Sequence, residues 1–322
     1  MRVLSGIQPS GRLHLGNYFG MMKPMLAYQR DHELYCFIVN YHALTTQQDG
    51  AVLRQHTLDA ACDFLALGLD ANRGVFWVQS DLPEVTELTW VLSNVTGMGL
   101  LERCHSYKDK VAQGTKPHHG LFAYPVLMTA DILMMQGEKI PVGVDQKQHV
   151  EVARDIAVRF NATYGETFTL PEPEVYSDGG MLPGTDGRKM SKSYNNTIEI
   201  FCDRETLVKK IRGFKTDSVP VESSKEPEAN ALFALYSNFL DAKGRAELRG
   251  RFSAPGLKYS AIKEELIDVI WKYFGPYRKI REELERDPSR VKRTLEKGAE
   301  KAREKARPTL EAVRKKTGID YR

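Results

Sequence analysis

VLSGIQPSGRLHLGN, at residues 3–17, decides the fold of this chain. Its first part, Val3 to Ile7, is an apolar run that predicts a buried strand, and the apolar spacing that begins at Tyr18 predicts a helix. A glycine-containing turn joins the two. A strand followed by such a turn and a helix N-terminus makes a site for anions, because the free N–H groups of the first helical turn point outward.

Composition places the chain among ordinary globular proteins. It has 322 residues, 42% of them hydrophobic, which is enough for a sizeable core and favours two domains. We find no charged segment followed by an apolar run and a small-residue cleavage site, and no run of apolar residues long enough for a membrane span. We therefore expect a cytoplasmic protein.

Four cysteines are spread along the chain without a C-x-x-C pair: Cys36, Cys62, Cys104 and Cys202. This spacing suggests neither a disulfide framework nor a zinc site, and we interpret the cysteines as reduced, mostly buried thiols. We expect neither zinc nor an iron–sulfur cluster.

The first half of the chain alternates between strand-like and helix-like segments. The strands are expected at residues 34–39, 75–78 and 140–144, and the helices at 51–67, 83–95 and 147–160. This alternation predicts an α/β fold with a parallel, Rossmann-like sheet covered by helices. Ligands of such sheets bind beyond the carboxyl ends of the strands, where the turn from Gly6 to Gly16 is expected.

The second part is predicted to be all-helical. From about Asp203 no strand pattern remains, and helices are expected at 205–214, 229–240, 260–274 and 289–316, with Gly275-Pro276 among the expected breaks. We therefore divide the chain into a catalytic domain over 1–188 and a region over 189–322 that contains a basic loop and a helical domain. Pro24 is expected to kink the helix that follows the opening motif.

Charge is distributed unevenly. Residues 272–322 hold 17 Lys and Arg against 9 Asp and Glu, whereas residues 1–271 hold 29 against 33. A basic end fits a contact with a polyanion such as nucleic acid. The alternative, which charge alone favours, is a solvated helix with pairs of side chains four residues apart.

A second motif lies about half the chain away from the first. It consists of Lys189-Met190-Ser191-Lys192-Ser193 and follows a loop with Gly179, Gly180, Gly184 and Gly187, so that mobile cations could close over a polyphosphate. The absence of G-K-[ST] excludes a Walker A loop. In this order, the two motifs resemble the signatures of class I aminoacyl-tRNA synthetases.

That resemblance implies the roles of individual residues. Catalysis would rest on positioning and charge neutralisation by His14, Asn17, Lys189 and Lys192. Magnesium-bound ATP would be held by Gln8, Pro9, Ser10, Gly16, Asn17, Gly143, Val144, Asp145, Leu182, Lys189, Met190, Ser191, Lys192 and Ser193. The magnesium would be held mainly by the phosphates.

A third block narrows the amino acid. The segments 120–133, 141–149 and 154–161 resemble the amino-acid pocket of tryptophanyl and tyrosyl synthetases. Met128 and Asp131 are three residues apart, so on a helix they share a face and offer an apolar wall and one acceptor. The resemblance implies that Asp131 accepts the indole N–H, with a cavity shaped by Tyr124, Met128, His42, Ile140, Val142 and Gln146.

Over essentially its whole length the chain resembles bacterial tryptophanyl-tRNA synthetases. This implies a homodimeric ligase that joins tryptophan to its tRNA, with residues 83–101 contributing to the dimer and the helical domain contacting the anticodon. Two rivals stay open: a tyrosyl synthetase, and a paralogue without catalysis that binds RNA or regulates. A smaller adenylyltransferase that shares only the first motif is disfavoured, because it needs neither the Lys189–Ser193 motif nor the helical domain.

Overall fold

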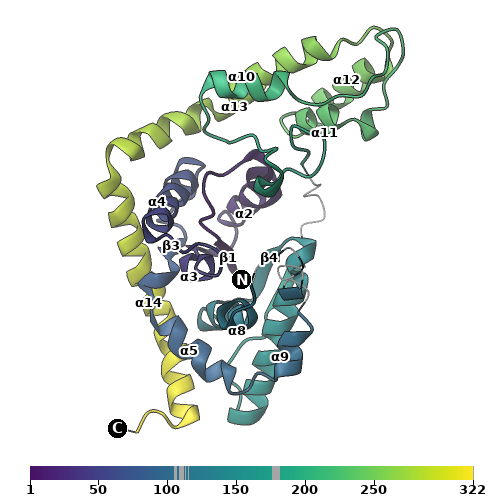
Figure 1. Ribbon diagram of the computed structural model, residues 1–322. Coiled ribbons are helices and arrows are strands. Elements are labelled where there is room, and N and C mark those ends of the chain that lie inside the picture. The colour runs from purple at the N-terminus through teal and green to yellow at the C-terminus, as the bar shows by residue number, and fades with distance from the viewer. Residues whose placement is uncertain (105–106, 109–111, 113, 115, 176–181, 322) are drawn as a thin grey trace. The chain divides into compact units, whose positions relative to one another are not determined.

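A parallel sheet forms the centre of the first part of the chain. The computed structural model describes residues 1–104, 107–108, 112, 114, 116–175 and 182–321, and in these residues the sheet has five strands in the order β3-β2-β1-β4-β5. Figure 1 labels three of them, β1, β3 and β4. The strands are β1 (Arg2–Ile7), β2 (Glu33–Ile38), β3 (Val75–Val78), β4 (Lys139–Val142) and β5 (Glu172–Val175). The predicted parallel α/β fold is confirmed.

Burial on both faces explains why the strands are continuous apolar runs. In β1, Val3 and Leu4 are almost completely buried, and they pair in parallel register with Leu34 and Tyr35 of β2. Parallel sheets need helices on both faces, so alternation of apolar and polar residues is absent from such strands. This pattern made the first three strands recognisable.

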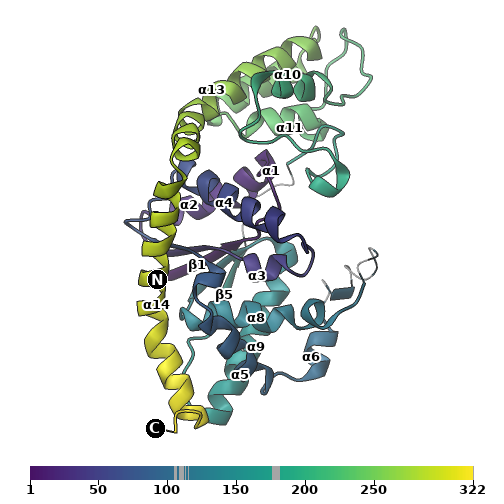
Figure 2. The same ribbon diagram turned by 60° about the vertical axis from the view of Figure 1, so that its left-hand side comes forward.

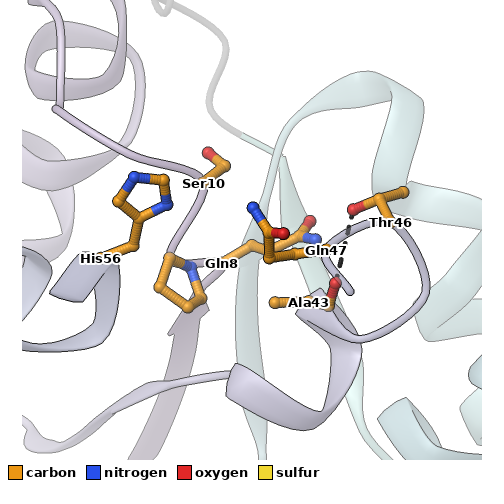
Figure 3. A pocket seen from close by; sticks show the side chains of 7 residues that line it. Gln8, Ser10, Ala43, Thr46, Gln47 and His56 are labelled. Atoms are coloured by element: carbon orange, nitrogen blue, oxygen red, sulfur yellow. Dashed lines mark hydrogen bonds between the residues drawn. The ribbon is translucent and has the colours of Figure 1, made fainter. Parts of the chain in front are cut away.

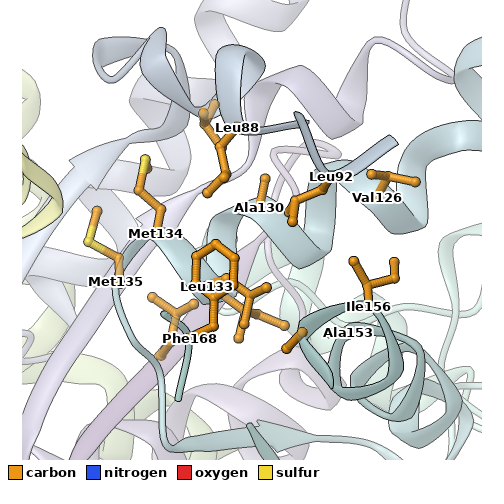
Figure 4. Packing of buried hydrophobic residues seen from close by; sticks show 14 of the residues in the cluster. Leu88, Leu92, Val126, Ala130, Leu133, Met134, Met135, Ala153, Ile156 and Phe168 are labelled. Atoms are coloured by element: carbon orange, nitrogen blue, oxygen red, sulfur yellow. The ribbon is translucent and has the colours of Figure 1, made fainter. Parts of the chain in front are cut away.

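Helices α5, α8 and α9 pack together beside the sheet. Their ranges are Glu84–Ser93, His119–Met134 and Lys147–Tyr164. Figure 4 shows Leu88 and Leu92 of α5 and Ile156 of α9 gathered around α8, where Ala130 and Leu133 are fully buried. This packing holds α8 in place, and α8 carries Asp131.

The remaining helices of the first part lie between the strands in sequence. Among the described residues they include α1 (Leu15–Asn17), a π-helix (Tyr18–Met22), α2 (Lys23–Tyr28), α3 (Asn40–Ala43), α4 (Gly50–Ala66), the 3-10 helix Gln79–Asp81 and α6 (Met98–Glu102). The helix after the opening motif is thus irregular directly before Pro24, since it changes from π-helical to α-helical there.

The chain folds into two compact units whose boundaries differ from the expected division at residue 188. The first unit comprises Met1–Gly11, Met25–Tyr176 and Arg286–Arg322, and the second comprises Arg12–Pro24 and Ser177–Glu285. The opening motif therefore belongs partly to the second unit. A physical reason is the aromatic packing of Tyr18, whose hydroxyl lies 3.0 Å from that of Tyr273.

Helices dominate the second unit, as predicted. They are α10 (Arg204–Arg212), α11 (Ala231–Ser237), α12 (Ala242–Ser253) and α13 (Tyr259–Arg286). The predicted break at Gly275-Pro276 is wrong, because α13 continues through Pro276. Aromatic and apolar packing on both sides of Pro276, such as buried Phe274 and the stacking of Arg278 on Trp271, compensates for the missing N–H.

The last helix, α14 (Pro288–Thr317), belongs to the first unit and packs against its other elements. Both ribbon views show α14, in yellow, along one side of that unit (Figures 1 and 2). Its buried face includes Leu295, Ala302 and Leu310, while Arg303, Lys305 and Arg314 pair with Glu84, Glu33 and Glu87. Part of the basic charge is thus neutralised within the first unit, and the helix is neither simply solvated nor entirely free for a polyanion.

Candidate active site

The opening motif forms a tight turn that is fixed by its own side chains. His14 is extended and precedes α1, and its backbone N–H donates to Asn17 Oδ1 over 3.0 Å. His14 is thus the N-cap residue, and Asn17, three residues later, bonds back to its backbone as in a capping box. Gly16 lies between them in a tight space, because a Cβ there would lie 3.0 Å from the Nδ1 of His14.

The second motif lies directly against the first within the second unit. The sulfur of Met190, which is 4% exposed, is 3.4 Å from the backbone nitrogen of Gly16. Farther along, the segment Ile198–Ile200 runs beside Leu13–Leu15, with Leu15 N donating to Ile198 O over 2.9 Å. Two motifs separated by more than 170 residues are thus brought together.

This junction is electropositive, and the imidazole of His14 responds to it. Burial, followed by the nearby charges of Lys192 and Lys210, lowers the pKa of His14 from 6.5 to about 4. At neutral pH the imidazole is therefore uncharged, while Lys189 and Lys192 stand exposed on the loop. Cations beside a helix N-terminus favour the binding of an anion such as a phosphate.

Hydrogen bonds of backbone and side-chain groups give the basic loop a defined shape. Met190 N donates to the carbonyl oxygen of Leu182 over 2.8 Å, and the hydroxyls of Ser191 and Ser193 lie 2.8 Å apart. Gly187 has a φ of +85°, which favours glycine. Gly179 and Gly180, which we counted in this loop, lie outside the described residues.

In the first unit, Asp131 is a buried acceptor that already has two donors around it. Its side chain is 5% exposed, and it contacts His42 Nε2 at 3.0 Å and Gln79 Nε2 at 2.9 and 2.8 Å. Burial raises the pKa of Asp131, while its bonds to His42 and Gln79 oppose that shift. The expected neighbours His42 and Asp131 are therefore in contact.

Gln79 is a residue that sequence reasoning missed. It is 1% exposed, and its own Oε1 accepts from Tyr41 N over 2.9 Å, so the amide is fixed at both ends. A signal was present, since Gln79 directly follows the apolar strand β3. Polar residues at the carboxyl end of a parallel strand are placed where ligands bind.

The other residues expected around an aromatic ligand come from α8, β4 and the turn after it. Tyr124 and His42 have their rings in edge contact, with centroids 6.2 Å apart, and the hydroxyl of Tyr124 lies 2.5 Å from His149 Nε2. Met128 packs against the apolar cluster that includes Ile140 and Val142. Gly143 and the 3-10 helix Val144–Gln146, which contains Asp145, follow at the carboxyl end of β4.

A small polar cavity opens where β1 and β2 end. It encloses about 140 Å³ and is shown in Figure 3. Its lining consists of the expected Gln8, Pro9 and Ser10 together with Ala43, Thr46, Gln47 and His56. The structure thus groups the expected residues into two sets: those from Gln8 to Ser10 and around Asp131 in the first unit, and those around His14 and Met190 in the second.

Comparison with known proteins identifies the family. The model of the class I tRNA synthetases for tryptophan and tyrosine (W and Y) matches residues 1–274. The chain belongs to this family. The α/β sheet, the junction of the two motifs and the family match agree, so the resemblance found in the sequence is confirmed.

Individual relatives cover this synthetase from end to end. It is 50% identical to the tryptophan–tRNA ligase of Campylobacter jejuni, over 99% of this chain and 100% of the relative, and 48% identical to that of Rhodopirellula baltica over the same shares. A crystal structure of the Campylobacter jejuni tryptophanyl-tRNA synthetase with ADP and tryptophan matches with a TM-score of 0.93 and 50% identity, over 99% of this chain and 100% of that one.

Proposed function

We propose that this synthetase is a tryptophan–tRNA ligase, which activates tryptophan with ATP and transfers it to the 3′-terminal adenosine of its tRNA. The observation that carries the proposal is the identity of about half the residues, over the whole length, with tryptophan–tRNA ligases. The buried acceptor Asp131 and the joined phosphate-binding motifs provide the chemistry that this reaction needs.

The first step needs positioning rather than a general base. The carboxylate of tryptophan is already ionised at neutral pH and attacks the α-phosphate of magnesium-bound ATP, which expels pyrophosphate. Lys189 and Lys192 neutralise the charge that develops on the leaving pyrophosphate. His14, uncharged, and Asn17 orient the phosphates at the helix N-terminus, and the cavity at Gln8–Ser10 takes part of the nucleotide.

Tryptophan is selected by the acceptor on α8. An indole N–H can donate to Asp131, whereas phenylalanine has no donor to offer to this buried carboxylate. His42, Gln79 and their neighbours hold that carboxylate in place. A tyrosyl synthetase is disfavoured, because relatives with 40–50% identity over nearly the full chain are tryptophan–tRNA ligases.

The partners follow from the surfaces of each unit. We expect the helical second unit and the cations of α14 that face solvent to contact tRNA(Trp). We expect a homodimer through the region of α5 and α6, where Trp90 is 73% and Met98 63% exposed.

No helix in the described part of the chain has the length and apolar character needed to cross a bilayer. Four free, buried cysteines fit the reducing cytoplasm that we propose as its location.

Exchange of labelled pyrophosphate into ATP tests the proposal. The assay is run with tryptophan, tyrosine and phenylalanine in parallel, followed by charging of tRNA(Trp). We expect exchange with tryptophan alone and transfer of tryptophan to the tRNA. Exchange with tyrosine alone would identify a tyrosyl enzyme, and RNA binding without exchange would identify a paralogue that lacks catalysis.

A further inference from the structure

Asn196 is a buried amide that makes hydrogen bonds to both ends of the basic loop. It is 2% exposed, although it follows four exposed residues. Its Oδ1 accepts from Ser191 N over 2.8 Å, and its Nδ2 donates to Asp186 Oδ1 over 2.7 Å and to the carbonyl oxygen of Lys189 over 3.0 Å. One side chain thus fixes the backbone on both sides of Met190.

The backbone of the loop is shaped to admit this amide. Gly184 lies so close to Asn196 that a Cβ at position 184 would overlap the Cγ and Nδ2 of Asn196 and lie 2.6 Å from its carbonyl oxygen. The same carbonyl oxygen accepts from Thr185 N over 2.9 Å. Glycine at position 184 is therefore required by the close approach of Asn196.

Immediately after Asn196, the chain contacts the opening motif. Ile198 O accepts from Leu15 N, and Ile200 N donates to Leu13 O over 3.0 Å. Asn196 therefore lies between the loop that carries the lysines and the segment that pairs with residues 13–15. Its side-chain amide bonds to the loop, and the residues two and four positions after it pair with the opening motif.

We infer that Asn196 is a positioning residue for adenylate formation, which holds the backbone of Lys189–Ser191 in register with the turn at His14–Gly16. This inference rests on the proposed function, since it assigns a role in that reaction. Asn196 touches no substrate in this role. It acts through the loop, whose lysines neutralise charge on the phosphates.

Only an amide satisfies both kinds of backbone group at this place. A leucine would leave the N–H of Ser191 and the carbonyl of Lys189 without their partner. An aspartate would keep the acceptor but lose the donor. It would also face Asp186, which is a carboxylate at neutral pH and whose pKa is lowered to about 2 by bonds from Asn196 and Arg188.

The test compares two variants that disturb the amide in different ways with one control. Asn196→Asp removes the donor without changing the shape of the side chain, and Gly184→Ala displaces the amide without changing its chemistry. Asn195→Gly is the matched control, since Asn195 is the exposed neighbour of the same type with a φ of +51°, which glycine also adopts. Each full-length protein is measured for tryptophan binding and for the kcat and KM for ATP of pyrophosphate exchange.

We expect both loop variants to lose about ten- to a hundredfold in kcat per tryptophan-binding site, because a displacement of about 1 Å is enough for such a loss. Tryptophan affinity should stay within about twofold of the wild type, since Asp131 lies in the other unit. Asn195→Gly should match the wild type. Normalising to binding sites separates this effect from incomplete folding.

Two results would overturn the inference: wild-type kcat and KM for ATP in both loop variants, or a loss of tryptophan binding that equals the loss of exchange. The latter would mean that Asn196 supports the structure in general. Failure of the proposed function is seen separately, as absence of tryptophan-dependent exchange in the wild-type protein.

Discussion

His14 shows how the site sets the charge of a single residue. It is 7% exposed and lies near two lysines, and within the described residues its Nδ1 has no hydrogen-bond partner. A protonated imidazole there would be desolvated and repelled by both lysines. Because the ring is uncharged, the positive charge of the junction comes from its lysine side chains. Long lysine side chains can move, which suits a site that must release pyrophosphate.

The pKa of His14 makes stability depend on pH. The pKa is about 4 in the folded chain and 6.5 in the unfolded chain, so the unfolded state takes up the proton first as the pH falls. Because of His14, we expect the free energy of unfolding to fall by on the order of 1 kcal/mol when the pH is lowered from 7 to 5. Urea unfolding of the wild type and of His14→Gln at both pH values measures this, and an equal pH dependence of the two proteins would contradict it.

Gln79 should determine how well Asp131 accepts a donor. In Gln79→Met the carboxylate loses two hydrogen bonds while the volume is nearly kept, and its pKa should rise further. We expect tryptophan to bind about tenfold more weakly, with the deficit growing as the pH falls. Calorimetric titration with tryptophan between pH 6 and pH 8 tests this.

The control for Gln79 is Gln136→Met. Gln136 also bonds backbone groups, those of Thr167 and Thr169, but does so just beyond the C-terminal end of α8. Equal losses of affinity in the two variants would show that general loosening of α8, rather than the state of Asp131, weakens binding.

At the scale of elements, α14 completes the first unit. Gly298 lies so close to β3 that a Cβ would overlap the carbonyl oxygen of Phe76 and lie 2.5 Å from its carbonyl carbon. Small residues such as Ala302 and Ala306 continue the buried face of the helix. The basic C-terminal helix is thus also a structural cover for the sheet, which the excess of charge does not reveal.

Gly298→Ala should destabilise this contact strongly. The added methyl meets backbone rather than a flexible side chain, so we expect a loss of about 3 kcal/mol in the free energy of unfolding. Gly250→Ala in α12 is the control, since its Cβ would meet nothing within 4 Å, and a gain of up to about 1 kcal/mol is expected there. Thermal and urea unfolding compare the two, and a stable Gly298→Ala protein would mean that α14 can shift along β3.

For the whole molecule, the exposed apolar side chains of the first unit bear on the proposed homodimer. Trp90 of α5 and Met98 of α6 are exposed large hydrophobic residues on neighbouring helices, with 73% and 63% of their surface accessible. Isolated exposed apolar residues are common, but two large ones on consecutive helices fit an interface. This supports the proposed homodimer.

Trp90→Glu should therefore produce a monomer. A charge placed in an apolar interface is costly because it loses water without gaining a partner. Sedimentation velocity measures the mass in solution, with Val158→Glu on α9 as the control, because Val158 is also exposed but lies outside this region. A dimer in Trp90→Glu, or a monomer in the wild type, would contradict the proposal.

Local sequence patterns were enough to predict many of the strands and helices. The apolar runs of β1, β2 and β3 and the spacing of α4 and α9 are visible in the sequence because their burial follows the repeat of strand or helix. The edge strand β5 was missed, since Glu172 and Glu174 make it too polar to resemble the others. The helix α12 was missed as well, because few of its residues are buried.

The sequence by itself determined the family chemistry: a strand, turn and helix for phosphates, a lysine-rich loop, and an acidic residue in an apolar helix. Only the tertiary structure revealed that Gln79 holds Asp131, that Asn196 bonds the backbone on both sides of Met190 and that α14 covers β3. The physical reason is separation along the chain. Local periodicity reports which face of an element is buried, but the partner of a buried polar group or the space at a glycine is set by residues as many as 222 positions away, as for Gly298 and Phe76.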